Sequence, residues 1–132
     1  MEVDLQVRPR SLLRIGNNMA ISQIQRAAIG RLLTRYCAPD PRPEVQRQLR
    51  HGFEFEPHGV VLFDERLLYN RPGNWIRQNV AKFRWVQTRA EWELYCQFSD
   101  LKWHRYEPRP TGATFEELLA EVDTDPTGIF WG

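Results

Sequence analysis

The chain has 132 residues, a formal net charge of +1 at pH 7, 42% hydrophobic residues, and five Trp, four Tyr and seven Phe. This length matches one domain that buries roughly two thirds of the surface of its unfolded chain and folds without a metal or disulfide. The composition excludes a disordered chain, and no apolar run approaches the ~18 residues of a membrane-spanning helix. We therefore expect one soluble domain that needs no cofactor and has no membrane partner.

Residues 1–18 show weak hydrophobic periodicity and contain proline, glycine and an Asn-Asn pair. We predict a flexible N-terminal extension here and a single α+β domain over residues 19–132. The extension lacks the apolar stretch of a secretory signal. Cys37 and Cys96 lack the C-x-x-C spacing of redox or metal sites. These features predict a cytoplasmic protein with two reduced thiols and no metal site.

The first regular element is an amphipathic helix over about residues 22–37. Ser22 and Gln25 have the spacing of a capping box. The apolar stripe expected to face the core consists of Ile21, Ile24, Ala28, Leu32 and Tyr36. The prolines of "APDPRP" end this helix, and Pro43 can open a short second helix.

Five segments with strand-like alternation follow. "HGFEFE" and "VVLFDER" predict a hairpin with Phe53, Phe55, Val60 and Leu62 on one face. "NVAKFRWV", "EWELYCQF" and "LKWHRYE" predict three more antiparallel strands, and "TFEELLAEV" predicts a last helix with its own capping box. The fold class is therefore α+β: a five-stranded antiparallel sheet preceded by one long and one short helix and followed by a C-terminal helix. The apolar terminal "GIFWG" is expected to fold back onto the domain.

The register of the last three strands decides which side chains share a face. A two-residue turn at Ser99 and Asp100 would place Tyr95 opposite His104, and the preceding hairpin would place Lys82 opposite Tyr95. One face would then be apolar, with Phe83, Trp85, Trp92, Leu94, Cys96 and Trp103. The other face would be basic and aromatic, and its candidate ligand-binding residues are Lys82, Arg84, Tyr95, Lys102, His104 and Tyr106.

The uneven charge distribution fits an anion-binding surface on the body of the domain, but helices near a terminus are also often acidic for solubility alone. Counting along the chain gives +3 for residues 1–41, +3 for residues 42–109 and −5 for residues 110–132. Bases interleaved with aromatic rings are how open sheets hold single-stranded nucleic acid. Polar residues with cross-strand ion pairs are equally ordinary on the solvated side of an antiparallel sheet, so the face also fits a plain surface.

Four stretches, "VAKFRW", "WELY", "LKWHRYEP" and "DPTGIFWG", resemble the domain of unknown function 3024 family, a group of short bacterial proteins. The resemblance extends from about residue 19 to residue 132. It implies a stand-alone bacterial domain and carries no catalytic role. It rests on Lys82, Phe83, Trp92, Tyr95, Lys102, Trp103, His104 and Tyr106.

Three functions remain open at this stage. The first is a binding module for nucleic acid or another phosphate-bearing ligand, with Arg105 set aside because the expected register turns it to the apolar side. The second is a metal-independent endoribonuclease with His104 or Tyr95 as general acid or base. The third is a protein-interaction or structural domain. No oligomeric state follows from the sequence.

If residues 1–18 are an extension, a protein that begins at Met19 should melt within a degree or two of the full-length chain, because few buried contacts would be lost. Thermal unfolding followed by circular dichroism measures this. A melting temperature about ten degrees lower would instead mean that apolar residues such as Leu12 or Ile15 pack into the core.

Overall fold

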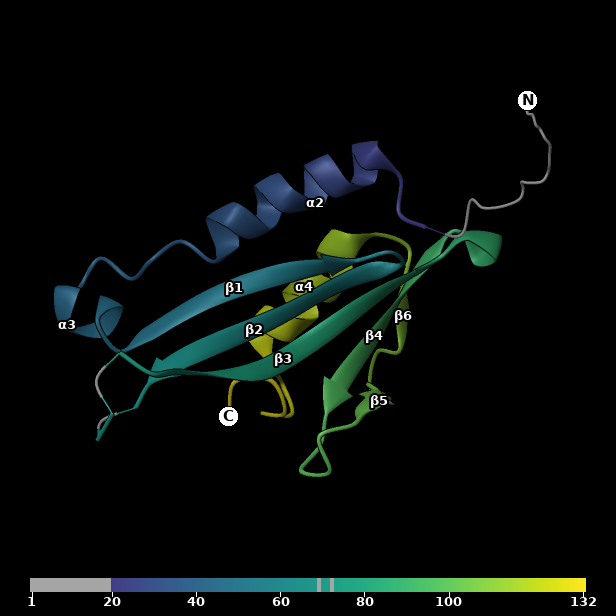
Figure 1. Cartoon of the computed structure of the whole chain (residues 1–132). Coiled ribbons are helices and arrows are strands. Elements are labelled where there is room, and N and C mark those ends of the chain that lie inside the picture. The colour runs from purple at the N-terminus through teal and green to yellow at the C-terminus, as the bar shows by residue number, and fades with distance from the viewer. Residues whose placement is uncertain (1–19, 69, 72) are drawn as a thin grey trace.

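The computed structural model describes residues 20–68, 70–71 and 73–132. Figure 1 shows an α+β fold, as expected, and the element labels follow that figure. In chain order the elements are α2 (Gln23–Tyr36), α3 (Pro43–Gln46), β1 (Leu49–Glu56), β2 (Gly59–Leu67), β3 (Trp75–Val86), the 3-10 turn η2 (Gln87–Arg89), β4 (Glu91–Gln97), β5 (Trp103–Arg105), β6 (Thr111–Gly112) and α4 (Phe115–Thr124). The expected extension over residues 1–18 lies outside the described residues.

The strands form one antiparallel sheet in the order β1-β2-β3-β4-β5, and the short β6 also pairs with β4. The first hairpin has the expected register, since Phe53 pairs with Leu62 and Phe55 with Val60. The register between β3 and β4 is also confirmed, with Lys82 opposite Tyr95. Among the described residues, no helix is long and apolar enough to cross a membrane.

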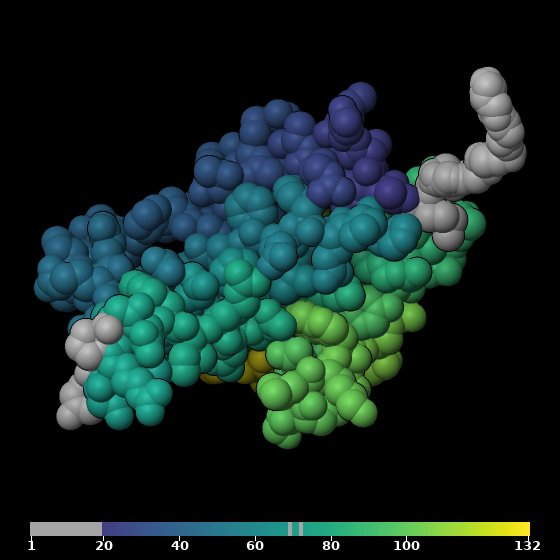
Figure 2. All heavy atoms as spheres, viewed as in Figure 1, coloured from purple at the N-terminus to yellow at the C-terminus, as the bar shows by residue number. Residues whose placement is uncertain are grey.

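Both long helices contribute to a core on one side of the sheet. In Figure 1, α4 lies behind the strands and α2 runs along β1. The core joins residues of both helices to the strand residues that face them, including Leu33, Val60, Phe83, Leu94 and Leu118. No described helix covers the opposite face, which is turned to the viewer in Figures 1 and 2.

Helix α4 has its expected apolar stripe, but only half of its expected capping box, since the Glu117 carboxylate accepts a 3.3 Å hydrogen bond from the backbone N–H of Ala113 instead of Thr114. Its apolar stripe, Phe115, Leu118, Leu119 and Val122, is buried. The Thr114 hydroxyl accepts a hydrogen bond of 3.2 Å from the backbone N–H of Glu117. This cap satisfies one of the four backbone donors that a helix start leaves without partners.

Helix α2 begins as expected but is rotated about its axis relative to the sequence prediction. The capping box is present, with Ser22 and Gln25 exchanging two hydrogen bonds of 3.1 Å. The buried residues are Ile29 and Leu33, whereas Ile24 is 84% exposed. The expected stripe is therefore wrong at Ile24 and Ala28 and only half-buried at Leu32 and Tyr36.

The rotation of α2 has a physical cause at its first turn. The backbone N–H of Ile21 donates a 2.9 Å hydrogen bond to the Pro57 carbonyl in the turn between β1 and β2. This bond fixes the entry of the helix at the sheet edge. Arg26 then lies with its guanidinium 4.7 Å from the Phe55 ring centre. The helix consequently turns the Ile29 and Leu33 row toward the sheet.

The hairpin between β4 and β5 differs from the expected register by one residue. Tyr95 pairs with Arg105, and Cys96 pairs with His104. The prediction that Tyr95 pairs with His104 is therefore wrong. Because side chains alternate between the faces of a strand, this shift exchanges the two sides of β5.

The shift arises because the chain uses residues 98–102 as the loop instead of a two-residue turn. Leu101 adopts the left-handed conformation, with φ of 64°. The Asp100 carboxylate accepts a 2.9 Å hydrogen bond from the backbone N–H of Lys102. Asp commonly stabilises such turns by bonding the backbone two residues on. Lys102 therefore lies in the loop, not in a strand as expected.

The C-terminal tail folds back onto the domain, as the sequence predicts. Asp125 ends α4 with a left-handed φ of 46°. Its carboxylate accepts hydrogen bonds from the backbone N–H groups of Phe130 (3.1 Å) and Trp131 (2.8 Å). The buried Phe130 ring lies 4.9 Å from the ring of Tyr106. These contacts attach the tail to the core.

Deletion of residues 129–132 should lower the free energy of unfolding by about 3 to 5 kcal/mol, the usual cost of removing a buried large aromatic side chain. Urea denaturation measures the change. Deletion of Gly132 alone is the control and should have little effect, since this residue has no side chain. Unchanged stability after the longer deletion would contradict the packing of Phe130.

Candidate functional site

The open face of the sheet carries every second residue of β3, β4 and β5. Lys82 and Arg84 project from β3, and Glu93 and Tyr95 project from β4 opposite them. The observed register adds Arg105 from β5, next to Tyr95. These five side chains occupy three neighbouring strands, a width of roughly 10 Å at the usual strand spacing.

A buried carboxylate lies at the centre of this face. The Glu93 side chain is only 5% exposed. Its oxygens lie 3.0 Å from a guanidinium nitrogen of Arg84, 2.8 Å from one of Arg89 and 3.5 Å from one of Arg105. The Tyr95 hydroxyl donates a fourth contact of 2.8 Å. We call Glu93, Arg84, Arg89, Arg105 and Tyr95 the Glu93 cluster.

The environment of Glu93 shifts its ionisation. Burial raises the pKa of the carboxyl, but hydrogen bonds from Tyr95 and Arg84 and the charges of Arg105 and Arg84 lower it by more, so the pKa lies below its usual value. The carboxylate is therefore ionised at neutral pH. Burial and the hydrogen bond to Glu93 raise the pKa of Tyr95. The Tyr95 hydroxyl thus stays protonated and donates a hydrogen bond to Glu93.

The Glu93 cluster has more positive than negative charge. Arg89 also contacts Glu91 at 2.8 Å, so three guanidinium groups meet two carboxylates and leave a net charge of +1. Each guanidinium has five N–H donors in a planar fork. The side chains of Arg84 and Arg105 remain 43% exposed. Glu93 therefore holds the arginines in place while part of each faces solvent.

The β1 end of the same face has no such surplus. Arg50 pairs with Glu65 at 2.8 Å, and Arg77 pairs with Glu54 at 2.7 Å. The two guanidinium groups also cover aromatic rings, because Arg50 lies 3.8 Å from the Trp75 ring centre and Arg77 lies 3.7 Å from that of Phe63. These arginines and rings already contact each other. Among the described residues of this face, the surplus of positive charge therefore lies at the Glu93 cluster.

A polar hollow adjoins the cluster. A cavity of about 250 Å³ is lined by Glu56, Pro57, His58, Lys82 and Arg84. Lys82 lies on its wall and pairs with Glu56 at 3.2 Å. Arg84 belongs both to this cavity and to the Glu93 cluster, so the two polar regions are continuous.

The structure separates the six candidate residues of the sequence analysis. Lys82, Arg84 and Tyr95 share the open face, whereas Lys102 is exposed in the loop between β4 and β5, and Trp103 takes the place expected for Lys102 opposite Gln97. His104 and Tyr106 lie on the other side of the sheet, so their expected place beside Tyr95 is wrong.

His104 and Tyr106 have structural contacts where they lie. The His104 ring stacks on Phe98 with 4.1 Å between ring centres, and its Nε2 lies 2.9 Å from Asp100. Tyr106 is 2% exposed and donates a 2.8 Å hydrogen bond to Glu121. Trp103, expected in the core, lies opposite Gln97 and is half-buried on the open side.

Sequence reasoning missed two members of the cluster. Arg105 was assigned to the wrong face by the one-residue register error. Arg89 lies in the turn before β4, where strand alternation predicts nothing about its direction. One signal was present in the sequence: Glu93 is four residues after Arg89 and directly opposite Arg84 in the confirmed register.

The geometry does not place His104, the expected acid or base, beside the arginines; the imidazole near Lys82 and Arg84 is that of His58, which lines the adjoining cavity. His104 lies across the sheet from Lys82 and Arg84, and Tyr95 uses its hydroxyl on Glu93. In the described part of the chain, no three His, Cys, Asp or Glu side chains come close enough to hold a metal ion. The arrangement is suited to holding an anion.

Replacement Glu93→Gln should lower the free energy of unfolding at pH 7 by about 1.5–3 kcal/mol, since hydrogen bonds to charged groups contribute that much. Because the folded carboxyl has a lowered pKa, its stabilisation exists above the unfolded value of about 4.3 and is lost as the pH falls through the folded value. The variant should therefore lose less stability than the wild type between pH 6 and about pH 3.

Urea denaturation at several pH values measures both effects. The matched control is Glu54→Gln, which removes an exposed carboxylate that pairs with Arg77 and should cost less than about 1 kcal/mol. Equal effects of the two replacements would contradict the central place of Glu93.

Comparison with known proteins adds the family. No curated protein and no solved structure matches the chain. A family model described as "Domain of unknown function (DUF3024)" matches residues 21–132, which include every described strand and helix. The chain belongs to the DUF3024 family.

Proposed function

We propose that the open sheet face is a binding site for a phosphate-bearing ligand, and that this ligand is single-stranded nucleic acid. The observation that carries the proposal is the grouping of Arg84, Arg89 and Arg105 around the buried Glu93. Planar guanidinium groups bind phosphate oxygens through two parallel N–H donors. Holding the side chains in advance reduces the entropy lost on binding.

The surroundings of the cluster favour a strand over a small anion. Lys82 and the polar cavity extend the basic region toward the β1–β2 turn. Trp103 and Tyr95 place aromatic rings next to Arg105 at the other end. An open groove with positive charge and aromatic rings holds successive phosphates while bases stack, without requiring a particular sequence.

The other two functions have less support from the geometry. An endoribonuclease with His104 as its general acid or base loses support, because His104 lies on the opposite side of the sheet from the arginines. A purely structural face gives no role to the surplus of arginines around Glu93. The ion pairs at the β1 end are balanced, but those of the Glu93 cluster are not.

The test is binding of a fluorescently labelled single-stranded RNA oligonucleotide, followed by anisotropy over a range of salt concentrations. Affinity should fall as salt rises, with a slope near ~0.7 per phosphate neutralised. Arg105→Gln should weaken binding and reduce this slope by less than about one unit. Tyr95→Phe keeps the ring and should have a smaller effect.

Arg47→Gln is the matched control, because Arg47 is exposed beyond α3 and away from the cluster. It should leave both affinity and slope unchanged. Absence of binding at low salt, or an equal loss in the control, would refute the proposal. Cleavage of the RNA in the presence of a chelator would favour the endoribonuclease instead.

A further inference from the structure

We propose that the helical side of the domain is a dimer interface, in which α2 of each copy packs against α4 of a second copy of the same chain. This side lies across the sheet from the Glu93 cluster, so the inference is independent of the proposed nucleic-acid site. It rests on a groove, an uncovered apolar stripe and the charges of the two helices.

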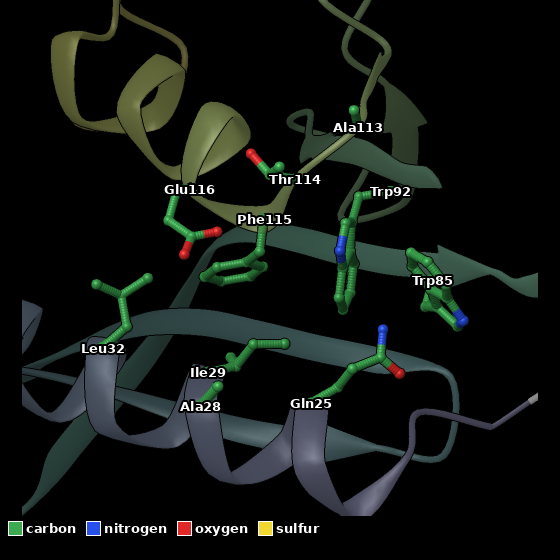
Figure 3. A pocket seen from close by; sticks show the side chains of 10 residues that line it. All are labelled: Gln25, Ala28, Ile29, Leu32, Trp85, Trp92, Ala113, Thr114, Phe115 and Glu116. Atoms are coloured by element: carbon green, nitrogen blue, oxygen red, sulfur yellow. The ribbon is translucent and has the colours of Figure 1, made fainter. Parts of the chain in front are cut away.

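The groove separates α2 from α4. Figure 3 shows the rings of Trp92 and Phe115 between the two helices, with Leu32 on one wall and Glu116 on the other. This part has a volume of about 240 Å³. A second hollow of about 220 Å³ continues from the same Leu32 and Glu116 to Tyr36 and Asp123. The groove therefore runs along most of α2.

Helix α2 carries apolar residues that the domain itself does not bury; Ala28 and Leu32 line the groove, whereas Ile24 lies outside its lining. Ile24 is 84% exposed, Ala28 is also exposed, and Leu32 is only half-buried. These residues belong to the amphipathic stripe that the sequence shows most clearly. The core uses Ile29 and Leu33 instead. An apolar stripe beside an aromatic-floored groove is typical of a surface that another protein covers.

The two helices have opposite charges. Helix α2 has three arginines and no acidic residue, and α4 has three glutamates, one aspartate and no basic residue. None of the ion pairs between described residues uses Arg31, Arg35 or Glu116. Asp123 accepts a hydrogen bond from the Tyr36 hydroxyl at 3.2 Å and likewise forms none of these pairs.

A two-fold axis parallel to the groove would pair the basic α2 of each copy with the acidic α4 of the other copy. Leu32 lies across the groove from Glu116, and Tyr36 lies across from Asp123. Rotation about this axis places α2 of one copy over α4 of the other at the same height. Arg31 and Arg35 then face the carboxylates of Glu116 and Asp123 in the partner copy.

A second copy fits this surface better than an unrelated protein. One chain carries both the basic and the acidic wall, and a two-fold interface requires a surface that is complementary to itself. Two identical contacts form together, and the aromatic floor of both grooves is covered. Opposite charges would set the orientation, and the apolar stripe would supply most of the attraction.

The test uses charge reversal and sedimentation velocity. The full-length chain should sediment as a dimer at micromolar concentration. Arg31→Glu with Arg35→Glu gives a variant with two acidic walls, and Glu116→Lys with Asp123→Lys gives a variant with two basic walls. Each variant alone should have its dissociation constant raised more than about tenfold by like-charge repulsion.

Mixing the two variants is the decisive measurement. An equimolar mixture should form a heterodimer, because the acidic α2 of the first variant faces the basic α4 of the second, and the acidic α4 of the first faces the basic α2 of the second. Restoration also shows that both variants are folded. Tyr36→Phe controls for the hydrogen bond lost with Asp123, and Arg47→Glu controls for a charge change elsewhere. Both should remain dimers.

Three results would overturn the proposal. One is a monomeric wild-type chain throughout the accessible concentration range. Another is a mixture of folded charge variants that stays monomeric. The third is dimers that persist in each charge variant alone, since these would assign the contact to another surface.

Discussion

The pairing of Cys96 with His104 determines how the two sides of this domain differ. A strand presents alternate side chains to opposite faces, so one residue pair determines the face on which each side chain of β5 lies. With this pairing, Tyr106 enters the core and reaches Glu121 on α4. Arg105 is turned the other way, toward Glu93. A loop of residues 98–102 thus decides both where the tail packs and which charges gather on the open face.

The Glu93 cluster illustrates why a buried carboxylate can persist in a sheet. Removing a carboxylate from water costs several kcal/mol unless its oxygens are fully bonded. Here three guanidinium groups and one phenol satisfy them. The same arginines remain partly exposed, so one buried carboxylate positions three guanidinium groups at the surface. Balanced surface pairs, such as Arg50 with Glu65, stabilise little and position nothing for a ligand.

Sequence reasoning succeeded where one local rule acted alone. The capping residues Ser22 and Thr114 are confirmed, and the pairing of Lys82 with Tyr95 follows from matching apolar residues across β3 and β4. Composition and alternation were enough to predict an α+β fold with its helices and sheet in order. These features depend on residues near one another in the sequence or on an unambiguous hydrophobic pattern.

The errors occurred where two patterns competed. Either register of the last hairpin buries at least part of Trp103 or Tyr106. The left-handed conformation of Leu101 decides between the two registers. Because non-glycine residues rarely adopt that conformation, the sequence gives no warning of it. Helix α2 has two apolar rows, and the hydrogen bond from Ile21 to Pro57 selects the one with Ile29 and Leu33. The first error misplaced three of the six candidate residues, namely Lys102, His104 and Tyr106.

The groove between the helices is a consequence of how the sheet holds them. Helix α2 contacts β1, whereas α4 contacts β3, β4 and β6. The helices are therefore supported by strands two or three positions apart, about 10–14 Å at the usual strand spacing. Packed helices have axes 8–10 Å apart, so a groove remains between α2 and α4, bridged at one end by the hydrogen bond from Tyr36 to Asp123. Arg31, Arg35 and Glu116 and the exposed apolar residues Ile24 and Ala28 are left facing outward, and in the proposed dimer a second copy supplies the surface that complements them.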